Sequence, residues 1–408
     1  MKSLDYLWWK MLFHKGHMKN RPKIQLALHD TCTGCTACAS VCPTGSISMK
    51  EDREGFLQPR IDTKTCIGCH KCEKICPVNL RNKGEWSLQG NEIQRGYAAK
   101  NTDLEERLRS SSGGISALLA HSVIQQGGVA VGVGFDEKWM PSYIIIDKEE
   151  YIYKIQGSKY AQAQIDISIF DKIKTYLKQG KIVLFTGLAC QIEGLVSYLG
   201  VYYENLILVD LVCLGISSPG VWRDYLDTFT SNQTIRHINF KDKSLGWHRF
   251  SVRIETNKKV QSLTGDKDFF MQSFFRTISV RRSCFNCPRR TLERVADITL
   301  ADCWGAYKKV PHMDDNKGLS AVIVHSRKGL AAFEAMHVEK EELKLCDIVE
   351  GNPNMIRDIE PDYKHRGAFH ITRNHISKRL AFIAYCKYNN FFHFIKNTIK
   401  SLCEHAFK

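Results

Sequence analysis

The chain has 408 residues, which is more than one hydrophobic core usually serves, so two or three domains are expected. Hydrophobic residues make up 43% of it and charged residues 25%, a balance that excludes a disordered protein, a fibre and a polytopic membrane protein. The formal net charge is +15, of which residues 1–23 carry +5 and residues 371–408 carry +6, so no basic stripe runs through the middle and no nucleic-acid partner is expected.

The basic ends also show helical periodicity. In the extension of residues 1–23, apolar side chains recur at helical spacing from Leu4 to Leu12, and the tail of residues 371–408 repeats this pattern. We expect both ends to pack on their own domain or on a partner subunit. Peripheral contact with a membrane surface is the alternative, because interfacial helices are also basic and rich in aromatic residues.

The chain contains 16 cysteines, which bear on the compartment in which it works. Secreted disulfide scaffolds are usually much shorter, and the close spacing of these cysteines suits metal better than disulfides. Asp5 and Lys10 interrupt the N-terminal apolar stretch, so no secretory signal is expected, and no run of about 18 apolar residues could span a bilayer. We expect a cytoplasmic protein with reduced thiols.

Residues 24–80 contain one cysteine pattern twice: C-x2-C-x2-C-x3-C, followed by proline. Three closely spaced thiolates can reach three corners of one [4Fe–4S] cubane, while the fourth cysteine leads toward the other cluster. The expected ligand sets are therefore crossed: Cys32, Cys35, Cys38 and Cys76 on one cluster, and Cys42, Cys66, Cys69 and Cys72 on the other. Two zinc sites are the alternative, but zinc prefers C-x2-C pairs with a longer spacer. The segment resembles a bacterial-type two-cluster ferredoxin.

Residues 81–94 form a polar linker, and residues 95–370 alternate apolar runs with helical patterns. The apolar runs at 182–185, 206–209 and 298–300 predict buried strands. This alternation indicates a mixed α/β domain. The fold class predicted for the chain is thus an α+β ferredoxin-like N-terminal domain followed by a mixed α/β domain.

A stretch rich in serine and glycine, residues 110–114, precedes apolar residues on one helical face from Ile115 to Val123. Gly127 and Gly128 end this predicted helix. Serines at a helix start cap free amides, and glycines let a ligand approach the backbone. The stretch suits a pyrophosphate group, although a plain capped helix explains it equally well.

Four more cysteines occupy suggestive positions in this second domain. Cys190 and Cys213 each follow a predicted strand, where sites gather in α/β sheets, and Cys284 and Cys287 form a C-x2-C pair. From the residues alone, a third cluster is as plausible as two buried small residues and a zinc pair. The remaining cysteines have no partners at ligand spacing and are interpreted as structural: Cys303, Cys346, Cys386 and Cys403.

Taken together, segments within residues 95–325 resemble the family of coenzyme F420 hydrogenase and dehydrogenase β subunits. The matching motifs occur in the family's order: SSGG at 111–114, GSKY at 157–160, CQIEGL at 190–195, DLVC at 210–213, SP at 218–219, C-x2-C at 284–287 and DITLADCWG at 297–305. The chain departs from the family pattern at Ala189, Leu214 and Cys303, which bears on a deazaflavin pocket more than on the clusters.

The resemblance implies that the second domain binds FAD and holds at least one further [4Fe–4S] cluster, with Cys190, Cys213, Cys284 and Cys287 as its expected ligands. It also implies seven flavin neighbours: Ser112, Gly113, Gly114, Gly157, Ser158, Lys159 and Tyr160. A cation such as Lys159 could stabilise the anionic reduced ring or neutralise phosphate. The alternative for Lys159 is a solvated surface side chain.

These features predict an iron–sulfur flavoprotein oxidoreductase. It would pass electrons between a one-electron carrier, such as a ferredoxin-like redox partner, and a substrate of coenzyme F420 type or a related organic hydride acceptor. Two alternatives stay open: a non-catalytic electron-transfer subunit of a larger complex, and a reductase in polysaccharide or cell-envelope precursor synthesis. No catalytic residue is assigned: Asp210 and Asp302, at predicted strand ends, are interpreted as structural caps, with a role in proton transfer as the alternative.

Overall fold

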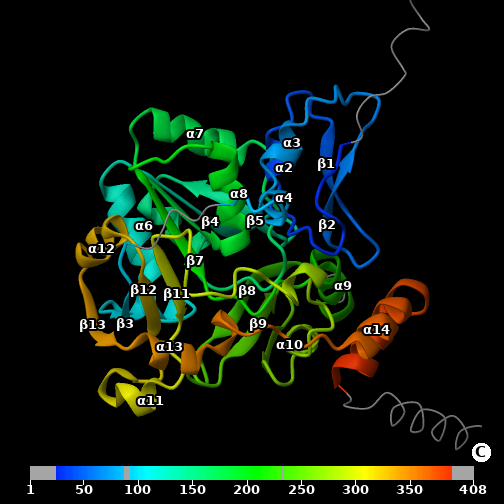
Figure 1. Cartoon of the computed structure of the whole chain (residues 1–408). Coiled ribbons are helices and arrows are strands. Elements are labelled where there is room, and N and C mark those ends of the chain that lie inside the picture. The colour runs from blue at the N-terminus through cyan, green and yellow to red at the C-terminus, as the bar shows by residue number, and fades with distance from the viewer. Residues whose placement is uncertain (1–23, 87–91, 231–232, 388–408) are drawn as a thin grey trace, which may run out of the picture.

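A computed structural model describes residues 24–86, 92–230 and 233–387 of the chain (Figure 1). The predicted basic extension of residues 1–23 and residues 388–408 of the predicted tail lie outside the described residues. Within the described ranges, no helix combines the length and the apolar character needed to cross a membrane.

The N-terminal module, residues 24–82, is built around the two cysteine repeats. Strands β1 (Ile47–Glu51) and β2 (Leu57–Ile61) pair in antiparallel fashion, and the helices are α2 (Ala37–Ser40), α3 (Lys71–Lys74) and α4 (Pro77–Asn82). The repeats adopt the same backbone: Gly34 and Gly68 have φ of 70° and 68°, and the residues that precede α2 and α3 also have positive φ. The equal sequence spacing thus gives two equivalent tight turns.

The main body contains one eight-stranded mixed sheet in the order β13-β3-β12-β11-β7-β6-β4-β5. Its strands are β3 (Arg95–Asn101), β4 (Val129–Phe135), β5 (Pro141–Ile146), β6 (Val183–Leu188), β7 (Leu206–Leu211), β11 (Ile298–Asp302), β12 (Ser320–Val324) and β13 (Val338–Leu343). The neighbours β4, β6, β7 and β11 run parallel, whereas β5, β12 and β3 pair antiparallel to theirs. All three strands predicted from apolar runs are present, within a mixed α/β body.

Helices cover both faces of this sheet (Figure 1). The residues of β6 alternate: Leu184 joins the core with α6 (Ile115–Gln125) and α12 (Arg327–Glu334). Val183 and Phe185 join the opposite core with α7 (Ile169–Lys178) and α8 (Ala189–Leu199). A central parallel strand buried on both faces explains why its sequence is a continuous apolar run.

Shorter helices connect these elements: α5 (Leu104–Arg109), η1 (Glu149–Lys154), η2 (Arg282–Cys284), α11 (Ala306–Lys309), η3 (Pro311–Met313), α13 (Leu345–Gly351) and η4 (Pro353–Met355). Residues that follow β6 and β7 come together with η2 at the carboxyl ends of these central strands. Thr33 of the N-terminal module lies at the same end of the sheet.

A second core lies beside the sheet, around the three-stranded antiparallel sheet β10-β9-β8. It contains β8 (Ile235–Asp242), β9 (Ser251–Thr256), β10 (Val260–Thr264), α9 (Pro219–Thr230), α10 (Phe269–Phe275), α14 (Tyr363–His375), α15 (Lys378–Phe382) and η5 (Ile383–Lys387). The boundary predicted at residue 370 falls inside α14. Phe369, Phe382 and Tyr385 are buried together with Trp222, so residues 371–387 are part of this core and not of a separate tail.

The N-terminal module is fixed against the main body by close backbone contact and buried charge. The Gly220 N–H donates to the Gly55 carbonyl at 3.1 Å, and the Glu54 carboxylate pairs with Arg366 and Arg282. On α8, a Cβ added at Gly194 would lie 2.8 Å from the Cβ of Cys35. The glycine on α8 therefore allows the first cysteine loop to lie directly against the helix that carries Cys190.

Candidate functional site

The eight cysteines of the N-terminal module line two separate cavities. Cys32, Cys35, Cys38 and Cys76 surround one cavity, and Cys42, Cys66, Cys69 and Cys72 surround the other. The structure thus brings the cysteines together in the crossed arrangement, in which the last cysteine of each repeat joins the other set. No group of three or more His, Cys, Asp or Glu side chains within the described ranges is arranged to hold a single metal ion.

Burial controls the charge state of these thiols. Desolvation raises the pKa of Cys35 to about 11, and it raises the pKa of Cys38 well above its ordinary value, with neighbouring thiols adding to the effect. Desolvation also raises the pKa of Cys72 to about 11. Cys42 is different, because hydrogen bonds around Thr44 outweigh burial and lower its pKa. The buried sulfurs of Cys35, Cys38 and Cys72 would therefore form thiolates readily only beside a compensating cation.

The third set of cysteines comes from three distant segments of the main body. Cys190 is the second residue of α8, Cys213 follows β7, and Cys284 and Cys287 lie at and after η2. All four line one cavity. Desolvation and the adjacent thiols raise the pKa of Cys213 to about 12 and that of Cys284 to about 11. All fifteen cysteines among the described residues are free thiols.

Four arginines also line this third cavity: Arg281, Arg289, Arg290 and Arg294. Arg281 is 2% exposed and donates to the Cys32 carbonyl at 2.7 Å, so it ties the first cysteine loop of the module to the third set. Arg289 pairs with Glu193, and Arg294 pairs with Asp210 at 3.3 Å. Thr33 of the first loop lines the same cavity. The set of Cys32, Cys35, Cys38 and Cys76 therefore lies next to the third set.

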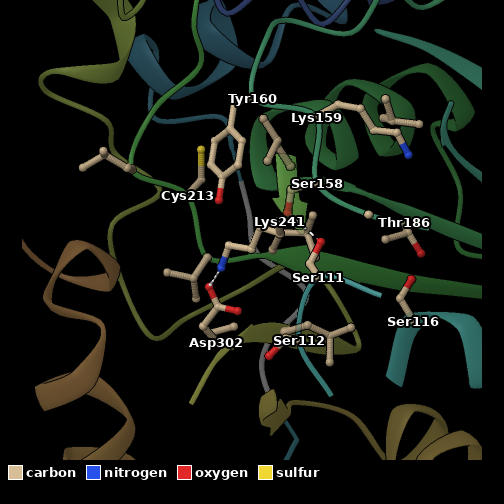
Figure 2. Close-up of a pocket in the computed structure, with 18 of the residues that line it drawn as sticks. Ser111, Ser112, Ser116, Ser158, Lys159, Tyr160, Thr186, Cys213, Lys241 and Asp302 are labelled. Carbon is tan, nitrogen blue, oxygen red and sulfur yellow. Dashed lines mark hydrogen bonds and ion pairs between the residues drawn. The ribbon is translucent and has the colours of Figure 1, made fainter. Parts of the chain in front are cut away.

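A larger cavity of about 620 Å³ lies beyond the third set, within the usual size range of cofactor sites. Of the seven flavin neighbours implied by the resemblance, six line it: Ser112, Gly114, Gly157, Ser158, Lys159 and Tyr160. The seventh, Gly113, packs behind the wall, where an added Cβ would lie 2.3 Å from the Ala99 carbonyl oxygen. Figure 2 shows Ser111, Ser112, Ser158 and Tyr160 grouped in this cavity.

The expectation that the serines cap helix α6 is wrong. The helix begins after Gly114, which has a φ of 86°, and no side chain caps it. The hydroxyls of Ser111 and Ser158 bond each other at 2.7 Å, and Ser112 donates to the Leu319 carbonyl at 2.6 Å. The serines thus connect neighbouring loops. The first residues of α6 line the cavity, and no side chain caps the backbone amides at the start of this helix.

Two lysines line the cavity, and they differ in their partners. The ammonium of Lys159 donates to the Gln156 carbonyl at 2.6 Å, and burial lowers its pKa to about 7. Lys159 is therefore neither fully solvated nor held by a counter-ion. Lys241 instead pairs with Asp302 (Figure 2). Lys241 was not predicted from the sequence, because nothing in the pattern of strand β8 marks a ligand residue. Asp302, at the end of β11, was interpreted as a structural cap.

The large cavity and the third cysteine cavity share part of their walls. Cys213, Leu188, Leu211, Gly215, Ile216 and Asn354 line both. The four cavities therefore follow one another. The cavity of the outer set (Cys42, Cys66, Cys69 and Cys72) comes first, and that of the inner set (Cys32, Cys35, Cys38 and Cys76), beside Thr33, comes next. The cavity of the third set and the large cavity follow. Cys213 lies where the cavity of the third set meets the large cavity.

Family models match most of the chain. Residues 180–350 match the model of the C terminus of the coenzyme F420 hydrogenase/dehydrogenase beta subunit, residues 96–167 match the model of that subunit's N-terminal part, and residues 31–80 match "4Fe-4S dicluster domain". Among solved structures, a chain of the F420-reducing [NiFe] hydrogenase complex from Methanosarcina barkeri superposes with a TM-score of 0.43 at 16% identity, covering 66% of this chain and 92% of that one.

Two curated relatives carry F420 in their names. The F subunit of the F(420)H(2) dehydrogenase of Methanosarcina mazei is 24% identical over 203 residues, or 47% of this chain and 56% of the relative. The coenzyme F420-dependent sulfite reductase of Methanocaldococcus jannaschii is 25% identical over 329 residues, or 78% of this chain and 47% of the relative. This chain spans about half the length of both. The family models show that it belongs to the family of coenzyme F420 hydrogenase/dehydrogenase β subunits, with a 4Fe-4S dicluster domain ahead of the family's two parts.

Proposed function

We propose that this chain is an iron–sulfur flavoprotein oxidoreductase that passes electrons between a one-electron carrier and an organic substrate that exchanges hydride. The substrate would be coenzyme F420 or a related acceptor. One observation carries the proposal: Cys213 lines both the third cysteine cavity and the large cavity, so a redox group in one would be next to a ligand in the other.

The cysteine sets fit three [4Fe–4S] clusters. Each set offers four sulfurs around a cavity, as a cubane requires, and most of these thiols have raised pKa values. Binding iron would release their protons and compensate the buried thiolates. In the N-terminal module, the N–H of Gly34 lies 3.4 Å from the sulfur of Cys32, so a backbone amide also faces the cysteine site.

The large cavity fits FAD in size and in the groups on its wall. Bound there, FAD would supply hydride exchange toward a substrate and single-electron exchange toward the clusters. The uncapped start of α6 would face the pyrophosphate, since free amides and the helix dipole favour anions. The Ser111–Ser158 hydrogen bond holds the two lining loops together. The Tyr143 hydroxyl donates to Gln191 at 2.6 Å, and both residues line the cavity.

The packing of the N-terminal module supports a continuous electron path. Thr33 and Arg281 connect the module's inner cysteine set to the third set, and Gly194 brings α8 into contact with Cys35. In the outer set, Cys69 is exposed, so that set could exchange electrons with a carrier in solution. We infer that electrons travel between this outer set and the large cavity.

Cofactor content of protein purified without oxygen tests the proposal. We expect about twelve iron atoms per chain, four for each [4Fe–4S] cluster, and one FAD released on denaturation. Cys213→Ser should lose about four iron atoms. Cys346→Ser, at an exposed cysteine outside all three sets, should keep the full complement. Protein that binds no flavin, or holds only about eight iron atoms before any substitution, would contradict the proposal.

The second candidate is an electron-transfer subunit without a substrate of its own. It is favoured by the name of one relative, which is a subunit of a dehydrogenase. Hydride exchange between the reduced protein and purified coenzyme F420 distinguishes the two functions. Turnover of this coenzyme supports the enzyme, whereas flavin that is reduced by a one-electron donor but gives no turnover supports the subunit.

A further inference from the structure

The wall of the large cavity that adjoins Cys213 contains an ion pair between a buried lysine and a partly buried aspartate. Lys241 lies on β8, and Asp302 is the last residue of β11. The Lys241 ammonium donates to an Asp302 carboxylate oxygen, and the side chains are 3% and 19% exposed, respectively. Figure 2 shows the pair beneath the hydroxyl of Tyr160, with Cys213 on the same side of the cavity.

Aromatic rings enclose this lysine. Its nitrogen lies 4.8 Å from the ring centre of Phe250 and 5.0 Å from that of Trp304. Trp304 in turn stacks on the fully buried Trp247, with ring centres 4.7 Å apart, so aromatic rings pack behind the pair. These rings attract a cation but leave Asp302 as the carboxylate that anchors it.

As a purely structural feature, such a pair adds little net stability to the fold. Moving charged groups out of water carries a desolvation penalty, and well-packed apolar residues often replace a buried pair without loss of stability. Charged groups kept at the wall of a ligand cavity therefore point to a role toward the ligand.

The neighbouring lysines show that Lys241 is held differently. Lys159 and Lys243 donate to backbone carbonyls, and burial lowers the pKa of each to about 7. Burial alone would also lower the pKa of Lys241, but the Asp302 carboxylate outweighs it and keeps the pKa above the ordinary value. Of the two lysines that line the cavity, Lys241 is thus the one whose positive charge a carboxylate stabilises.

We propose that Lys241 is the cation that compensates the negative charge gained by a flavin ring on reduction, and that Asp302 anchors and moderates this cation. The inference rests on the proposed function, because it requires a flavin in the large cavity. A hydride brings two electrons and one proton, so a neutral ring that accepts it gains one negative charge. Two single electrons and one proton from water leave the same charge. From the sequence, this role was expected of Lys159.

The midpoint potential of the bound flavin tests this role, measured by anaerobic spectroscopic titration of the full chain. Lys241→Gln leaves a carboxylate facing the ring, so we expect the ratio of reduced to oxidised flavin at a fixed potential to fall at least tenfold. For a two-electron couple, this is a downward shift of about 30 mV. At about pH 6, where a buried lysine without a carboxylate partner remains protonated, Asp302→Asn leaves an unbalanced cation and should shift the potential upward. Lys241→Arg keeps the charge and should stay close to wild type.

Opposite shifts distinguish charge compensation from a structural role, since both Lys241→Gln and Asp302→Asn break the same ion pair. Shifts in the same direction, or no shift in either variant, would overturn the inference and leave the proposed function intact. If Asp302→Asn fails to fold, the comparison of Lys241→Gln with Lys241→Arg decides, and equal potentials overturn the inference. Wild-type protein that binds no flavin would instead overturn the proposed function itself.

Discussion

The contact between Gly194 and Cys35 gives a sharp prediction about how the N-terminal module depends on the main body. A Cβ built at Gly194 would lie 2.8 Å from the Cβ of Cys35 and 3.0 Å from its sulfur. Carbon atoms in good contact are about 3.5 Å apart or more, so Gly194→Ala requires a displacement of about 0.7 Å. Metal–ligand distances tolerate only about 0.2 Å. The substitution should therefore disturb the cluster site of Cys32, Cys35, Cys38 and Cys76.

Two opposing effects determine the stability of this variant. Overpacking a well-packed region typically costs about 1–3 kcal/mol. Alanine in a helix is about 1 kcal/mol more favourable than glycine. The free energy of unfolding should therefore fall by about 0–2 kcal/mol, too little to unfold the protein. The main effect should be local, on cysteine geometry.

Iron content and electron paramagnetic resonance of the reduced protein measure the outcome. We expect Gly194→Ala to lose up to about four iron atoms, or to show an altered signal for one cluster. Gly367→Ala is the matched control, because Gly367 lies within helix α14 and an added Cβ there meets nothing within 4 Å. This control should keep all its iron. Unchanged iron and spectra in Gly194→Ala would refute the close approach of α8 to the first cysteine loop.

Two further predictions concern buried and partly buried charge. Glu54→Gln leaves the 2% exposed Arg366 without its carboxylate partner, so the free energy of unfolding should fall by about 3 kcal/mol and proteolysis should release the N-terminal module faster. Glu51→Gln, which breaks the half-exposed pair with Arg223, should cost at most about 1 kcal/mol, and equal losses in both variants would contradict the burial argument. Burial opposes protonation of His121, but its hydrogen bonds to Glu149 and Glu106 raise its pKa above 6.5. Protonated His121 therefore stabilises the folded state at pH values below the pKa of histidine in the unfolded chain, and this stabilisation is lost as pH rises through the higher pKa of the folded state. His121→Gln should thus lower the melting temperature more at about pH 5.5 than at about pH 9.

Local spacing made the N-terminal module predictable. The four-cysteine pattern requires the same turn in both repeats, and positive φ at Gly34 and Gly68 provides it. The buried strands of the sheet were predictable for a similar reason, since β6 and β7 bury both faces and must be continuously apolar. In both cases the decisive information lies within a few residues.

Features that depend on distant segments were harder to predict. The third cysteine set joins residues from 190 to 287, and the residues alone left a zinc pair open. Ser112 bonds the carbonyl of Leu319, 207 residues away, and so does not cap its own helix. The boundary at residue 370 was misplaced because apolar residues beyond it complete the core around Trp222. The periodicity of that segment indicates an apolar face but does not indicate which core the face packs against.

The charges around the third cysteine set give a physical reason for its place between the module and the large cavity. The arginines there are only partly neutralised: Glu193 is shared by Arg81 and Arg289, and Asp210 pairs with Arg294. Arg290 donates to the carbonyls of Leu214 and Cys284, and its guanidinium lies 3.7 Å from a carboxylate oxygen of Asp358, which is 60% exposed. Nearby positive charge favours the more negative, reduced form of an iron–sulfur cluster. If the third set holds a cluster, as proposed, these arginines would favour its reduced form beside the large cavity, whose wall carries the Lys241–Asp302 pair.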